Sequence, residues 1–116
     1  MPTTNRGVIK ITGAPPLVYD QKTLTADYTI QPSDNNLILI FNSSSNLTCT
    51  IPADFDFVDG FQVIIFQRGT GIVTVVADTG VTTLSANNEL ETRARYSMVH
   101  IIKIATNTYI VGGDLA

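Results

Sequence analysis

Hydrophobic and polar residues alternate over short stretches along most of the chain, and turn-forming residues separate these stretches. Alternation with a period of two residues occurs in Leu24–Ile30 and Leu47–Ile51, Leu37–Phe41 is continuously apolar, and Phe61–Phe66 is apolar except for Gln62. A period of two is that of a β-strand, and no helical period of 3.6 holds over ten residues. The pattern predicts roughly eight to ten short strands at a spacing of about 8–12 residues. We find no internal repeat of fixed period.

The stretch Gly60–Ala77 is the centre of this pattern. Its two apolar runs, Phe61–Phe66 and Ile72–Ala77, flank the polar link Gln67–Gly71. The link contains two glycines, which can adopt the positive φ values of a tight turn, so we predict a β-hairpin here. Both sides of Phe61–Phe66 are mostly apolar, so we expect this strand to be covered on two faces, as in the middle of a sandwich or barrel.

The first residues of the chain have a different character. Gly7–Thr12 has the pattern of a short strand, but Pro15 and Pro16 interrupt regular structure because proline lacks the backbone donor. We expect an all-β fold, with residues 1–22 forming an extended N-terminal arm and residues 23–116 forming one small antiparallel β-sandwich or barrel. The arm either wraps its own domain or reaches onto a neighbouring subunit. Its candidate contact residues are Arg6, Val8, Ile9, Ile11, Pro15, Pro16, Leu17 and Tyr19.

Composition narrows the class of protein. The 116 residues suit one domain, and only 15% of them are charged, below the usual quarter. A net charge of -3 lacks the basic footprint of a nucleic-acid binder, and we interpret Arg93 and Arg95 as an ion-paired edge rather than a basic groove. No apolar run approaches the roughly 20 residues of a membrane span, and no signal-peptide pattern opens the chain, so we expect a soluble protein made in a cytoplasm. Cys49 is the only cysteine, and alternation makes it a small buried side chain.

Residues able to carry out chemistry are few. His100 is the only histidine and lies in an apolar run, so we interpret it as a strand residue and not as a metal ligand or catalytic base. Asp54, Asp56 and Asp59 fall in one loop where calcium ligation is conceivable, but the loop lacks the spacing of a calcium-binding motif. We expect no enzymatic activity, no cofactor and no metal. A carbohydrate-stacking platform would have to use tyrosines that we interpret as rim or core residues, namely Tyr19, Tyr28, Tyr96 and Tyr109.

The order of motifs between residues 35 and 115 is more specific than any single motif. The sequence resembles a β-rich module of the virion proteins of tailed bacteriophages. The resemblance is carried by Thr50-Ile51-Pro52, by GFQV at 60–63, QRGTGIVTVVA at 67–77, GVT at 80–82 and Leu84, and then by RYS at 95–97, IKI at 102–104, TNTY at 106–109 and GGDL at 112–115.

The resemblance implies a non-enzymatic β-domain that is part of a phage particle after synthesis in the host cytoplasm and is commonly a homotrimer. A short chain with an N-terminal arm is typical of a capsid decoration (cement) protein, whose partners are the major capsid protein and other copies of itself. The alternative is a tail-fibre or tail-tip receptor-binding protein or another minor virion protein, and among these phage roles carbohydrate is a partner only in the alternative. A free carbohydrate-binding module or enzyme is a further alternative. None of these implies binding to nucleic acid or membrane.

Overall fold

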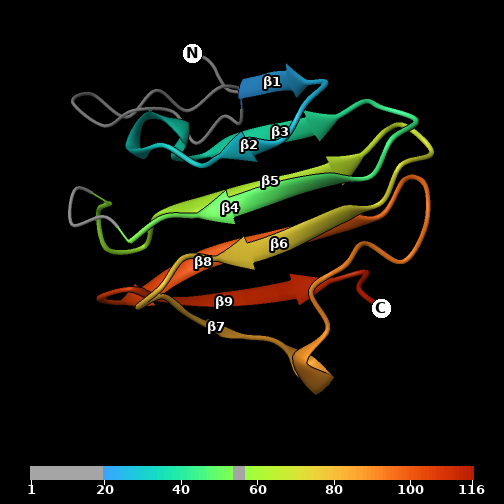
Figure 1. Cartoon of the computed structure of the whole chain (residues 1–116). Helices are drawn as coiled ribbons and strands as arrows, with labels where there is room; N and C mark the ends of the chain where they lie inside the picture. Colours follow the sequence, from blue (N-terminus) through green and yellow to red (C-terminus); the bar gives the residue numbers. More distant parts are fainter. Residues whose placement is uncertain (1–19, 54–56) are drawn as a thin grey trace, which may run out of the picture.

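A computed structural model describes residues 20–53 and 57–116, which form two β-sheets and no long helix (Figure 1). The all-β prediction is confirmed. In the described residues, no helix has the length and apolar character needed to cross a membrane. The six-stranded sheet has the order β1 (Asp20–Leu24), β3 (Leu37–Phe41), β5 (Gln62–Gln67), β8 (Met98–Ala105), β9 (Thr108–Gly113) and β7 (Thr82–Leu84); the three-stranded sheet has the order β2 (Tyr28–Thr29), β4 (Leu47–Ile51) and β6 (Val73–Ala77).

The first six strands alternate between the two sheets, so the chain winds as a coil. Strands β1, β3 and β5 are parallel neighbours in one sheet, and β2, β4 and β6 are parallel neighbours in the other. Of the seven strand pairs in the described residues, only β5–β8 and β8–β9 are antiparallel, so the expected antiparallel pairing is wrong for the other five.

The second and third turns of the coil are a structural repeat. Leu37 of β3 is in register with Val63 of β5. Leu47 of β4 is in register with Val73 of β6, and these two residues are the same number of residues apart as the first pair. The expectation of no internal repeat is therefore wrong. The two copies share an apolar pattern and not residue identity, so the repeat is not visible in the sequence.

The predicted hairpin of Gly60–Ala77 does not form, because β5 and β6 lie in different sheets. The link between them packs on the equivalent link of the preceding turn instead of folding back. The amide of Gly71 donates to the carbonyl of Ser43 at 2.8 Å, and the amide of Arg68 donates to the carbonyl of Phe41 at 2.8 Å. These bonds direct the chain across the molecule to the three-stranded sheet.

The C-terminal part departs from the coil. Strands β8 and β9 form a hairpin that is inserted between β5 and β7, and β7 pairs in parallel with β9. The β8–β9 turn places Asn107 at φ 49, a left-handed conformation that asparagine tolerates better than most residues.

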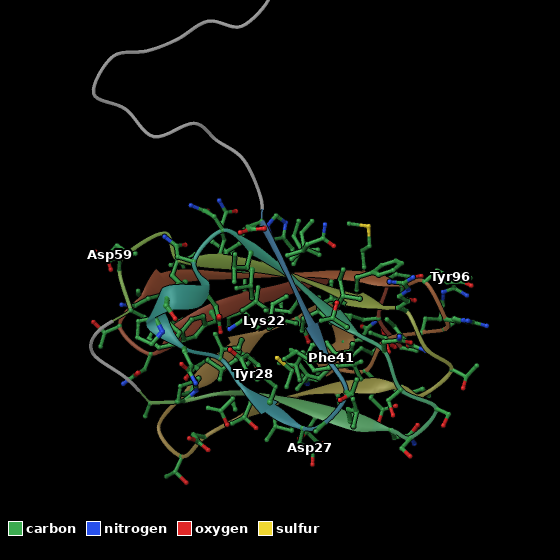
Figure 2. All side chains as sticks on the ribbon, turned by 90° about the horizontal axis from the view of Figure 1, so that it is seen from above. Lys22, Asp27, Tyr28, Phe41, Asp59 and Tyr96 are labelled. Atoms are coloured by element: carbon green, nitrogen blue, oxygen red, sulfur yellow. The ribbon has the colours of Figure 1, made fainter. Side chains whose placement is uncertain are left out.

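The core lies between the two sheets, where Figure 2 shows them as two layers with Phe41 between them. Leu47, Cys49 and Ile51 are all buried, as alternation predicted. The single strand predicted for Leu24–Ile30 is instead divided, since the chain bends after Leu24 to pass from one sheet to the other. The largest fully buried side chains include Tyr109, Phe41, Phe61, Ile30 and Leu39.

Candidate interaction face

The side of the six-stranded sheet that points away from the three-stranded sheet, which we call the outer face, carries alternate residues of each strand. Residues in register on neighbouring strands point to the same side of a sheet, so they form rows across it. Three rows cross the outer face: Thr23–Ile40–Phe66–Met98, then Gln21–Ile38–Ile64–His100–Gly112, and then Gln62–Ile102–Ile110–Leu84.

The outer face is largely apolar: its polar side chains are Gln21 and Thr23 at the β1 edge and the Gln62–His100 pair, and its three rows contain no Asp, Glu, Lys or Arg. Met98 is 51% exposed, Leu84 47% and Ile110 39%. A sheet with one face in water normally alternates apolar and polar residues. Strand β5 instead is apolar on both sides, and among the described residues only its inner side, with Val63 and Ile65, is covered. Within the described part of the chain, the expectation that this strand is covered on two faces is confirmed for the inner side only, and Gln62, Ile64 and Phe66 on the outer side are half-buried.

An aromatic cluster lies at the end of the first row. The ring of Tyr96 stacks on that of Phe66, with centroids 6.1 Å apart and planes at 20°, and the Arg95 guanidinium lies 4.9 Å from the Tyr96 centroid. Tyr96 is 60% exposed and has φ 74, a conformation that costs a bulky residue roughly 1–3 kcal/mol. Its backbone is held by a 2.7 Å bond from its amide to the carbonyl of Gln67, so a strained corner presents an aromatic ring beside the outer face.

A shallow hollow lies in the middle of the face. It has a volume of about 210 Å³ and is lined by residues of β5, β8 and β9, among them Ile64, Met98, His100 and Gly112. Sites for small molecules usually measure about 300–1,000 Å³, so this hollow suits a protein side chain better than a drug-sized ligand. His100 Nε2 lies 3.2 Å from Gln62 Oε1, which agrees with its interpretation as a hydrogen-bonded strand residue.

The opposite surface of the molecule, the outer face of the three-stranded sheet, has a different chemistry. Thr50 is in register with Thr29 on one side and with Val76 on the other, and Thr48 is in register with Thr74. Hydroxyl groups therefore dominate this face, and Val76 is the one large hydrophobic side chain that is exposed on the described three-stranded sheet. The two sheets thus offer one apolar surface and one hydroxyl-rich surface.

Lys22, Tyr28 and the buried Asp34 form a polar network near β1 and β2, where Figure 2 labels Lys22 and Tyr28. Lys22 Nζ donates to Asp34 Oδ1 at 2.8 Å and to the Tyr28 hydroxyl at 2.9 Å, and that hydroxyl donates to Asp34 Oδ2 at 2.6 Å. The bond to Asp34 raises the pKa of Lys22, and burial followed by the bond to Asp34 raises the pKa of Tyr28. Asp34 is fully buried, so this network pins the turn after β2 and does not present a carboxylate to a substrate.

The two close arginines bind carbonyl and carboxylate oxygens. Arg93 Nε and Nη2 donate to Asp114 at 2.6 and 2.9 Å, and Ser97 Oγ donates to the same carboxylate at 2.8 Å. The Arg93 bond lowers the pKa of Asp114 and raises that of Arg93. Arg95 donates to the carbonyl of Arg68 at 3.0 Å. This confirms an ion pair for Arg93, although the segment forms only isolated bridges and no strand.

Most of the predicted arm lies outside the described residues, and strand β1 begins at Asp20, before the expected end of the arm at residue 22. Asp54 and Asp56 of the acidic loop also lie outside. Asp59 is exposed and lies 3.7 Å from Lys103, and no group of three or more possible metal ligands occurs in residues 20–53 and 57–116. The predicted contact residues that lie outside are Arg6, Val8, Ile9, Ile11, Pro15, Pro16, Leu17 and Tyr19.

Sequence reasoning did not identify the outer face as a candidate site. Two signals for it were present, namely the two-sided apolar pattern of Phe61–Phe66 and the long apolar run around Met98–Ile104. Both patterns are also those of strands inside a core, because apolar residues are usually buried. Of the tyrosines considered for stacking, Tyr109 is buried and Tyr96 is exposed.

Three comparisons with known proteins give no further guide to the site: no family model, no curated protein and no solved structure matches the chain.

Proposed function

We propose that this chain is a non-enzymatic structural subunit of a tailed-bacteriophage particle, and that it decorates the assembled head by binding the major capsid protein. The observation that carries the proposal is the uncharged apolar outer face of the six-stranded sheet. Apolar patches of several hundred Å² on a protein surface usually mark sites of protein association. A decoration protein needs such surfaces because it acts only when bound.

The resemblance to phage virion modules supports the same function, and its motif residues have clear structural tasks here. Gly69 and Gly71 let the link after β5 approach the preceding turn of the coil. Asn107 forms the β8–β9 turn, and Asp114 binds Arg93. These residues form the turns and links of the folded subunit. The resemblance is therefore to a structural subunit whose partners contact its surfaces.

A homotrimer suits this function for a physical reason. When three copies are joined, attachment of one copy raises the effective concentration of the other two at the shell, so weak single contacts add up to stable binding. The low charge of the chain also favours contacts made by apolar and hydroxyl groups over salt-dependent ones.

The proposal is tested by locating the chain in purified phage particles. We expect it in DNA-filled heads separated from tails, and we expect heads stripped of it to rebind the purified chain. Deletion of residues 1–16 should weaken rebinding while the circular dichroism of the two sheets is retained. Recovery of the chain only with tails, and never with heads, would refute the decoration role. Glycan or host-cell binding by the isolated chain would favour the tail-tip alternative.

A further inference from the structure

We propose that the outer face of the six-stranded sheet is the surface by which one copy of this chain binds another copy. This inference assigns the face that the proposed function invokes to the contact between copies of the decoration subunit, so that contact with the shell falls to other surfaces of the assembled copies. It rests on that function only for its biological purpose, since association between copies can be measured without a phage particle.

The absence of charge favours a second copy as the occupant. A partner recognised by electrostatic complementarity would need Lys, Arg, Asp or Glu opposite its own charges, and the three rows contain none. An uncharged, largely apolar face can pack on the same face of other copies: two such faces pack as do the sheets of a β-sandwich, about 10 Å apart, and three of them arranged about a threefold axis enclose a common apolar core. The hydroxyl-rich face of the three-stranded sheet has no comparable apolar row.

The size of the face is adequate for this role. Six strands about 4.8 Å apart, five of them five or more residues long at about 3.3 Å per residue, give a flat area on the order of 500 Å². A contact between two such faces buries about 1,000 Å² in total, which is the lower limit for a specific interface, and the exposed Tyr96 and Ile104 add apolar surface at its margins.

The kinds of residue on the face are those that dominate binding energy. Aromatic residues, methionine and arginine are enriched at the centres of interfaces, and Phe66, Met98 and the Tyr96–Arg95 pair lie together at one side of this face. The hollow beside Met98 gives a second copy a place for a protruding side chain. The strained backbone of Tyr96 keeps its ring exposed, as expected of a side chain that is buried by a partner.

The first test compares the mass in solution of the full chain and of two variants, by sedimentation over a range of protein concentrations. We expect wild type to associate into a species several times the 12.5 kDa chain mass, with three copies if the resemblance to phage modules holds. Met98→Glu places a charge on the outer face and should raise the dissociation constant at least a hundredfold. Val76→Glu changes a side chain of similar exposure, 37%, on the other sheet and should associate as wild type does.

The second test reports which face is covered. Met98→Cys and Val76→Cys each add one exposed thiol to a chain whose own Cys49 is buried. At concentrations where wild type associates, we expect the thiol at position 98 to react with a thiol reagent at least tenfold more slowly than on dilution, and the thiol at position 76 to react equally fast at both concentrations. This readout keeps the inference testable even if Met98→Glu fails to fold.

The outcomes separate this inference from the proposed function. A wild-type chain that remains monomeric at every concentration, or one that associates with position 98 fully reactive, overturns the inference. Loss of head binding in Met98→Glu without any association of wild type also overturns it, because the face would then bind the shell. Association through the outer face by a chain that is never found on phage heads supports the inference and refutes only the decoration role.

Discussion

A Cβ atom placed on Gly69 would lie 2.2 Å from the carbonyl oxygen of Ser43, so the links of two successive turns of the coil touch through their backbones. The same is true one step further along, where a Cβ on Gly71 would lie 1.9 Å from the carbonyl oxygen of Ser45. Only glycine allows this approach. The two residues that suggested a hairpin turn are required instead for one turn of the coil to stack on the next.

Substitution of these glycines should therefore destabilise the fold. We expect Gly69→Ala and Gly71→Ala each to lower the free energy of unfolding by about 1–3 kcal/mol, because the added methyl group meets backbone atoms that cannot rotate away. Gly112→Ala is the control, since a Cβ there meets nothing within 4 Å. Urea unfolding followed by circular dichroism measures all three. Equal stability of Gly69→Ala and Gly112→Ala would contradict the close stacking.

The buried bond between Thr92 and Gln67 should contribute strongly to stability. The Thr92 hydroxyl donates to Gln67 Oε1 and accepts from the Val73 amide at 2.9 Å, so it joins the start of β6 to the end of β5. Thr92→Val keeps the shape but leaves both partners unpaired, and we expect a loss of about 2–4 kcal/mol. The matched control Thr48→Val on the outer face of the three-stranded sheet should change stability by less than about 0.5 kcal/mol. A loss no larger than that of the control would contradict this role.

The Lys22–Tyr28–Asp34 network should make stability fall at alkaline pH. The folded-state pKa of Lys22 is raised, so its contribution is complete below the unfolded value of about 10.4 and is lost as pH rises through the folded value. The raised pKa of Tyr28 acts in the same direction. Thermal unfolding from pH 7 to 12 should show a smaller alkaline decline for Asp34→Asn than for wild type. Substitution of the exposed Asp78 by Asn serves as control. An alkaline loss of stability as large in Asp34→Asn as in wild type would disprove the prediction.

Loss of the ion pair of Arg93 with Asp114 should lower stability at acid pH. The folded-state pKa of Asp114 is lowered, so its stabilising effect is present above the unfolded value of about 3.9 and is lost as pH falls through the folded value. Asp114→Asn should therefore melt at a lower temperature than wild type near pH 6, and the two melting temperatures should converge near pH 2. A constant difference across this range would show that the ion pair is not the cause.

Much of the strand pattern could be predicted from the sequence because burial in a strand depends on nearby residues. Alternation correctly identified the buried side of Leu47–Ile51, and the apolar run Leu37–Phe41 correctly predicted a strand. Asn107 could be assigned a left-handed conformation because that preference is local too. The candidate site could not be found in this way, since an apolar side chain has the same pattern whether it faces the core or an uncovered face.

The sequence by itself determined that the chain is all-β, where most strands lie, and which residues of Leu47–Ile51 are buried, because each follows from side-chain alternation over a few residues. Only the tertiary structure decided that β5 and β6 lie in different sheets, that most pairs are parallel, and that one side of the six-stranded sheet is left apolar by the described chain. The physical reason is that strand partners are chosen by contacts between distant residues. The approach of Gly69 to Ser43 is such a contact, and no local pattern contains it.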